Sequence, residues 1–376
     1  MYLIISVLIL SSVCLFKSRL IQLILLFMIY PIIILGAIND SGITYRIINS
    51  VGEYYYSQYF EVAFFYQALF YVTLIIPLFF LRNSKFNGLR VPVNNSMRYI
   101  FFISLLIIYP IAYPAIFGFG DDRFGSGGSL VLILNALLIF SRREKIELID
   151  FLVISLNLFA LISGERADTI LILLVYYVLK SDGKNIYERD ISYLSLILIL
   201  FSILLIGLFS GINRMGGEFT IDYLLYYILN QGTVVDVLHV YLSAFWYVEK
   251  FGFNYEPIIN LMSSFIPFFS LGGASSSYNV TEILRDMIIN VGGGVFYTAG
   301  YVSFGVLGGM FISFFYGYFL RILFCGGGVL HILFVAIFLQ QLRLQWYGLN
   351  YMGNVVSVGL VIFMSIYFLR YLSRIK

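Results

Sequence analysis

A succession of long apolar runs constrains this 376-residue chain more than any other feature of its sequence. A helix needs roughly 20 apolar residues to cross the hydrocarbon core of a bilayer, and several of the runs approach that length. Charged residues make up only 11% of the chain, whereas ordinary globular domains carry about 25%. The pattern predicts an all-α integral membrane protein, a single membrane domain over residues 1–376 with about eleven (10–12) transmembrane helices. The predicted helices cover Met1–Phe16, Leu20–Ile38, Phe60–Leu81, Tyr99–Phe119, Ser129–Phe140, Phe151–Ile162, Ile170–Leu179, Ile191–Gly211, Gly292–Leu320, Val329–Gln340 and Met352–Leu369.

Basic residues concentrate in every second connection between these runs. Loops with an excess of Lys and Arg face the cytoplasm by the positive-inside rule. This rule places 16 of the 23 Lys and Arg residues inside and 14 of the 20 Asp and Glu residues outside. It predicts an outer N-terminus and an inner C-terminus. Seven basic residues are exceptions to the rule, so their outer position needs another reason: Arg46, Arg123, Arg166, Arg214, Lys250, Arg285 and Arg343.

The two short runs 151–162 and 170–179 are either the arms of a hairpin or one helix interrupted at its middle. The sequence Ser-Gly-Glu-Arg-Ala-Asp (163–168) lies between them. Basic clusters precede the first run and follow the second, and both clusters belong inside. Two crossings are therefore favoured, which places Arg166 at the outer tip of a hairpin.

The longest interruption of the apolar pattern extends from Gly211 to Tyr301, where polar, glycyl and aromatic residues are mixed. It predicts one large extracytoplasmic segment, about 212–291, between late helices. We expect this segment to form most of an active site on the outer face of the membrane. A net charge of +3 is too small to indicate a nucleic-acid partner, and the two distant cysteines predict no disulfide framework.

Three arginines on the predicted outer face, Arg166, Arg214 and Arg285, are candidates for binding an anion. A guanidinium offers a planar fork of donors that matches phosphate oxygens. The alternative is a local ion pair or a solvated surface charge; for Arg166 the partner would be Glu165 or Asp168. The outer segments hold no Asp-x-Asp, no cysteine pair and no histidine pair, so we expect no metal and no other cofactor.

Two further features of the outer segment could take part in chemistry. His239 follows Asp236 by three residues and so would share its helical face, an arrangement that orients an imidazole as a general base. Glu282 is a second candidate base, and a structural role is the alternative for the histidine. The run Gly292-Gly293-Gly294 lies at a helix entrance, where backbone amides can approach a phosphate or helices can pack closely.

Several short motifs, in this order, resemble the oligosaccharide repeat-unit polymerases, the Wzy-type O-antigen polymerases of bacterial envelopes. They are the hairpin sequence 163–168, Phe265-Ile266-Pro267 in the outer segment, Gly292-Gly293-Gly294-Val295, and Tyr301-Val302-Ser303-Phe304-Gly305-Val306-Leu307-Gly308 entering a span. Members of that family show a small-Arg-small motif where this chain has Gly164-Glu165-Arg166-Ala167. The glutamate is a departure that tempers the charge of Arg166.

The resemblance implies a glycosyltransferase that polymerises repeat units linked to undecaprenyl diphosphate, on the outer face of a bacterial cytoplasmic (inner) membrane. Arg166, Arg214 and Arg285 would clamp the departing diphosphate, and His239 or Glu282 would take the acceptor proton. Glu165, Asp168, Gly292, Gly293 and Gly294 would contact substrate. The implied partners are lipid-linked oligosaccharides, membrane lipids, a chain-length regulator (polysaccharide co-polymerase) and a flippase.

Three other functions remain open at this stage. A flippase for lipid-linked oligosaccharides would share the composition, but it should show two related halves and charges along a central cavity. An O-antigen ligase has nearly the same layout and differs in its acceptor. A membrane scaffold without catalytic activity would need no outer arginines.

Overall fold

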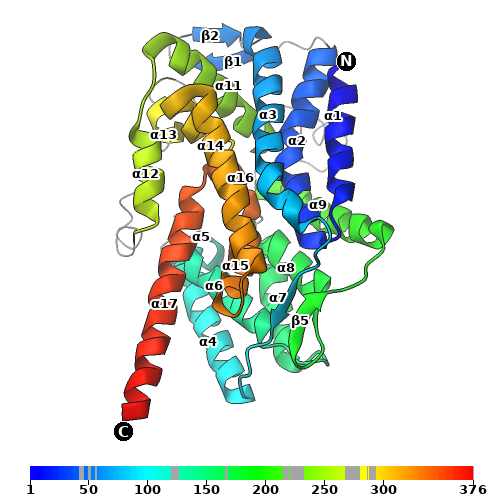
Figure 1. Ribbon diagram of the computed structural model, residues 1–376, viewed down its shortest axis with the longest axis vertical. Helices are drawn as coiled ribbons and strands as arrows, with labels where there is room; N and C mark the ends of the chain where they lie inside the picture. Colours follow the sequence, from blue (N-terminus) through cyan, green and yellow to red (C-terminus); the bar gives the residue numbers. More distant parts are fainter. Residues whose placement is uncertain are drawn as a thin grey trace.

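The computed structural model is an elongated bundle of helices with its two termini at opposite ends (Figure 1). It describes residues 1–41, 46–49, 52–55, 57–119, 127–165, 168–214, 220, 233–266, 280–285, 287 and 294–375. The described residues are 78% helical with almost no sheet, which confirms the all-α class. The helices are α1 Tyr2–Ser11, α2 Arg19–Ser41, α3 Phe60–Leu78, α4 Asn95–Ala112, α5 Pro114–Phe117, α6 Gly128–Phe140, α7 Leu148–Ile162, α8 Thr169–Val178, α9 Tyr193–Arg214, α11 Thr233–Phe251, α12 Glu256–Ser264, α13 Val280–Arg285, α14 Thr298–Cys325, α15 Val329–Leu339, α16 Gln341–Tyr347 and α17 Asn350–Ile375.

Four helices of the described residues are long and apolar enough to cross a membrane: Arg19–Ala37, Phe60–Leu81, Asn95–Ala112 and Thr298–Cys325. Seven shorter apolar helices accompany them. Their surfaces are apolar: Ile100, Ile103, Ile107 and Ile111 of α4 are each more than half exposed and repeat along one helical face. A soluble protein rarely exposes so continuous an apolar stripe, so these helices are compatible with a membrane protein. The count of eleven crossings stays a prediction.

A small sheet holds the basic connections together at one end of the bundle. Strands β3 Asn87–Leu89, β5 Asn185–Glu188 and β4 Leu179–Ser181 pair antiparallel in the order β3-β5-β4. Buried Glu188 accepts hydrogen bonds from the Ser18 hydroxyl and the Arg19 backbone amide, so this strand caps the start of α2. Connections that are far apart in sequence therefore meet on one side, as the alternating charge pattern requires.

The N-terminus and the start of α3 lie at the other end of the bundle. The Met1 amino group pairs with Asp40 at 2.9 Å, and the Asn39 amide donates to the Phe60 carbonyl at 3.0 Å. A two-stranded hairpin, β1 Arg46–Asn49 and β2 Gly52–Tyr55, lies beyond α2 at this end (Figure 1). Which side of a membrane each end faces stays a prediction.

Helix α14 bends sharply near its start. Phe304 and Gly305 leave the helical conformation, and Gly305 has φ +62°, which a side chain would strain. The ring centroids of Phe296 and Tyr316 lie 5.4 Å apart, whereas 20 residues of straight helix would separate them by about 30 Å. The segment before the bend therefore folds back on the helix after it. The predicted span Gly292–Leu320 begins with this folded-back segment.

The last apolar runs are joined by a short polar helix inside the molecule. Helix α15 ends at Leu339, α16 follows at once, and Gly348 with φ +104° turns the chain into α17. Buried in α16 are the side chains of Gln341, Arg343 and Gln345. Interrupted helices are tolerated at membrane depth only where protein or a watery cavity surrounds them, so this interruption marks a polar interior.

Candidate functional site

One cluster of deeply buried charges in the described chain forms around Arg343. The guanidinium donates two hydrogen bonds to Asp168, Nε to Oδ1 at 3.2 Å and Nη2 to Oδ2 at 2.8 Å. Nη2 also contacts Glu165 Oε1 at 3.4 Å. The side chains of Arg343, Glu165 and Asp168 are 7%, 0% and 1% exposed. Charges so far from water are stable only when paired, and within membrane helices such pairs are candidates for function.

The local sequence builds the turn that presents the two carboxylates. Helix α7 ends with a Schellman motif: Gly164 has φ +113°, its N–H donates to Leu161, and the Glu165 N–H donates to Ala160. Thr169 closes the turn on the other side, where its hydroxyl donates to the Glu165 carbonyl. Glu165 and Asp168 therefore face the core from a tightly fixed backbone.

A chain of polar side chains continues from this cluster into α4, α6 and α7. The Tyr113 hydroxyl donates to Asp168 Oδ2 at 2.7 Å. Further along, the Tyr109 hydroxyl donates to the Asn157 side-chain oxygen, and the Asn157 amide donates to Asn135 at 3.2 Å. All of these residues are buried. The turn is thus held by Tyr113 and Arg343, while the asparagines join α6 to α7 nearby.

Helices α7 and α8 form the predicted hairpin, and whether its tip faces the outside stays a prediction. Helix α8 has 10 residues and rises about 15 Å, half of what the roughly 30 Å hydrocarbon core requires. At the tip Glu165 and Asp168 are buried, whereas Ser163 is exposed. The two carboxylates are buried because Arg343 supplies the opposite charge from a distant part of the chain. Arg166 itself lies outside the described residues.

The other predicted site residues are placed only in part. Gly292 and Gly293, and the side chains of Arg214 and Arg285, lie outside what the structure describes, so the convergence of the arginines stays a prediction. Glu282 is half-buried on α13. Gly294 donates its N–H to the Trp346 carbonyl of α16, one helical turn from Arg343. Its Cβ position lies 3.1 Å from Val240, which leaves little room for a side chain.

His239 lies on α11, most of which packs in the core instead of forming a solvated loop. Burial lowers the pKa of His239 from its usual 6.5 to about 4. The imidazole is therefore neutral at pH 7 and can accept a proton, although as a weak base. The side chain of Asp236, its predicted partner, lies outside the described residues.

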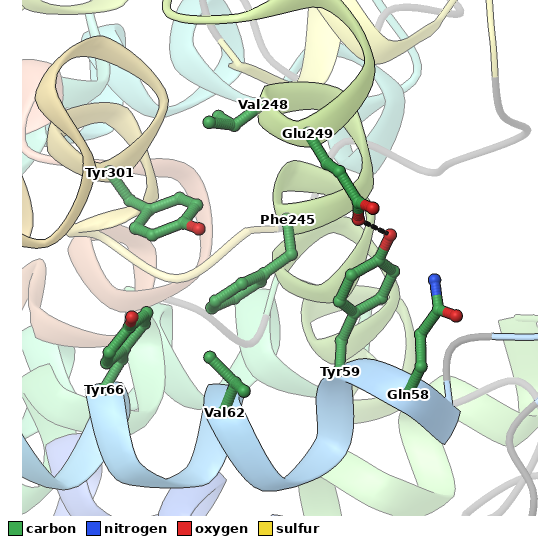
Figure 2. Close-up of a pocket in the computed structure, with 8 residues that line it drawn as sticks. All are labelled: Gln58, Tyr59, Val62, Tyr66, Phe245, Val248, Glu249 and Tyr301. Atoms are coloured by element: carbon green, nitrogen blue, oxygen red, sulfur yellow. Dashed lines mark hydrogen bonds between the residues drawn. The ribbon is translucent and has the colours of Figure 1, made fainter.

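A pocket of about 400 Å³ opens near the start of α3 (Figure 2). Three helices contribute to it: α3 with the turn before it, α11 and the first turn of α14. The pocket lies near the start of α3, whereas Arg82 and the three-stranded sheet lie beyond the other end of this helix (Figure 1). Its lining residues are Gln58, Tyr59, Val62, Tyr66, Phe245, Val248, Glu249 and Tyr301.

Aromatic rings form the walls of this aromatic pocket, and one carboxylate lies at its rim. The Phe245 centroid lies 4.4 Å from that of Tyr301, 5.9 Å from that of Tyr66 and 6.2 Å from that of Tyr59. The Tyr59 hydroxyl donates to Glu249 Oε2 (Figure 2). Ring faces offer apolar surface, and the phenols and the carboxylate offer hydrogen bonds, so the pocket suits an amphipathic ligand.

Comparisons of the chain with protein families, with curated proteins and with solved structures find no match. The function must therefore be argued from the two sites themselves.

The sequence indicated Glu165 and Asp168 but missed their partner. Arg343 stood out only as a basic residue on the wrong predicted side, and that anomaly was the available signal. Tyr66 and Phe245 did not stand out, because aromatic residues make up 19% of the chain. Glu249 was one of several charged residues in the outer segment and was assigned no role.

Proposed function

We propose that this protein polymerises lipid-linked oligosaccharide repeat units by glycosyl transfer on the outer face of a bacterial cytoplasmic membrane. One observation carries the proposal: the hairpin sequence 163–168, which resembles the polymerase motif, holds two buried carboxylates that pair with buried Arg343. Two carboxylates and a guanidinium in such surroundings are expensive unless they serve a purpose. The Arg343 cluster fixes both sides of Arg166 in the sequence.

The reaction requires stabilisation of charge on the departing undecaprenyl diphosphate. Preorganised donors aimed at developing charge contribute roughly 3–4 kcal/mol each. Arg166, Arg214 and Arg285 are assigned to this clamp, and neither a metal nor another cofactor is invoked. His239 or Glu282 takes the proton of the acceptor hydroxyl, and such a base contributes on the order of 10²–10⁴ in rate. Neutral His239 is in the correct protonation state for this role.

The surroundings of the reaction follow from its substrates. The undecaprenyl chains remain in the bilayer while the diphosphate and the sugars reach the protein. A chain-length regulator and a flippase are the partners that this activity requires.

Glycan ladder analysis of a deletion strain tests the proposal against its alternatives. Loss of a polymerase leaves single repeat units attached to the lipid core. Loss of a ligase leaves a bare core, and loss of a flippase retains the lipid-linked unit on the cytoplasmic face. Only the first pattern, reversed by the gene on a plasmid, supports polymerisation; a normal ladder in the deletion strain refutes it.

A further inference from the structure

We propose that the aromatic pocket is a sugar subsite that binds a neutral pyranose ring. The proposed function supplies the natural source of that ring, the glycan of the lipid-linked substrate. The binding itself rests on the geometry of the pocket and can be tested separately.

The aromatic wall of the pocket suits one face of a sugar. Pyranose rings carry patches of C–H groups, and these pack against the electron-rich faces of aromatic rings. Tyr66 and Phe245 stack on each other with an interplanar angle of 19° and centroids 5.9 Å apart, and Tyr301 packs beside Phe245, so the three rings form one continuous wall. A volume of about 400 Å³ falls within the usual range of small-ligand sites, roughly 300–1,000 Å³.

The pocket also offers hydrogen-bonding groups that its own residues do not use. Glu249 is exposed, and its Oε1 has no hydrogen-bond partner among the described residues, while Oε2 accepts from Tyr59. Among the described residues the hydroxyls of Tyr66 and Tyr301 also have no hydrogen-bond partner. All three residues line the pocket, and in Figure 2 the Phe245 ring lies between the Glu249 carboxylate and these two hydroxyls. A ligand with several hydroxyl or amide donors would satisfy them.

The charge of the rim selects the kind of sugar. A carboxylate accepts hydrogen bonds from sugar hydroxyls or from an acetamido N–H. It repels a second carboxylate, because like charges in a partly desolvated site disfavour each other. The pocket should therefore take neutral hexoses and N-acetylhexosamines and reject uronic acids.

Saturation-transfer NMR on the purified full-length protein in detergent tests this inference. The probes are N,N′-diacetylchitobiose and digalacturonic acid, which are disaccharides of similar size. We expect transfer to the neutral probe and roughly tenfold weaker binding of the acidic probe, from the lost hydrogen bonds and the repulsion. No transfer to the neutral probe, or equal binding of both, would overturn the assignment.

Variants of the pocket locate the binding. Phe245→Ala removes a wall and should abolish transfer, and Glu249→Gln should weaken neutral binding while admitting the acidic probe. Matched controls come from Tyr255→Ala and Glu256→Gln, which change exposed residues that do not line the pocket. If Phe245→Ala fails to fold, the conservative change at exposed Glu249 decides. Equal binding by wild type and Glu249→Gln for both probes would refute the site.

The same variants separate this inference from the proposed function. In a polymerase, Glu249→Gln should raise KM for the lipid-linked unit and leave kcat nearly unchanged. Sugar binding without any polymerisation defect in the deletion strain would retain the subsite and refute the polymerase. A polymerase whose pocket variants bind as the wild type does would refute the subsite alone.

Discussion

The Arg343 cluster and the aromatic pocket both place polar groups in an apolar bundle. They differ in their exposure to water and in whether other protein groups form hydrogen bonds with their polar atoms. In the cluster, Asp168 is matched by Arg343 and Tyr113, and the turn that carries it is locked by backbone hydrogen bonds. In the pocket, Glu249 is exposed and keeps an unused oxygen. The comparison teaches a division of roles: the buried cluster holds the backbone in place, and the open pocket retains the capacity to bind.

The largest effect is expected from the labelling of single cysteines by a reagent that cannot cross the membrane, because a cysteine on the far side does not react at all. In a background with both cysteines replaced, Glu249→Cys should react with an impermeant maleimide added to whole cells whose outer envelope has been permeabilised. Lys184→Cys lies in the exposed turn between β4 and β5 and should react only after lysis. Labelling of Lys184→Cys in intact cells would invert the topology and put the pocket on the wrong side for outer-face chemistry.

The next largest effect concerns the cluster. Arg343→Met removes the buried guanidinium that pairs with Asp168, and breaking such a pair costs about 3–5 kcal/mol. We expect a large fall in thermal stability in detergent and in membrane abundance. The control is Arg143→Ala, whose ion pair with Glu147 at 3.0 Å is 43% exposed at the arginine and should contribute about 1 kcal/mol or less. Similar small losses for both variants would show that the cluster does not hold the fold.

A smaller effect is expected from His239, on the buried part of the helix that carries Glu249 at its exposed end. The pKa of His239 is lowered to about 4 in the folded protein. Stability should therefore be complete above the unfolded pKa of about 6.5 and decline as pH falls towards 4, by at most about 3 kcal/mol. Melting temperatures between pH 7.5 and 4.5 measure this, and His239→Leu should flatten the decline. An unchanged slope in His239→Leu would assign the pH dependence to other groups.

The sequence allowed the helices and the grouping of connections to be predicted because both follow from local composition and charge. Apolar runs become helices, and the basic segments at Arg82 and Lys184 meet at one end, as their shared sign indicated. Two features depended on distant contacts and were missed. The bend at Gly305 requires the return of Phe296 to Tyr316, and the burial of Asp168 requires a partner 175 residues away in the sequence.

The aromatic pocket could not be predicted for a different reason. Tyr66, Phe245 and Tyr301 come from three separate helices, and a chain rich in Tyr and Phe contains many triplets of this kind. Aromatic residues at helix ends are also expected at a membrane interface, which hides any signal for ligand binding. Only the packing of the helices distinguishes this set from the others.

Replacement of Arg166 tests the central claim, that the turn held by Arg343 serves glycosyl transfer, most directly. If the fork of guanidinium donors binds the diphosphate as charge develops, Lys fails as a replacement because it lacks the bidentate geometry. Arg166→Lys and Arg166→Ala should both abolish long glycan chains while the protein still accumulates in the membrane, as quantified on the same samples by glycan ladder and immunoblot. A ladder of normal length from well-expressed Arg166→Ala would contradict the account.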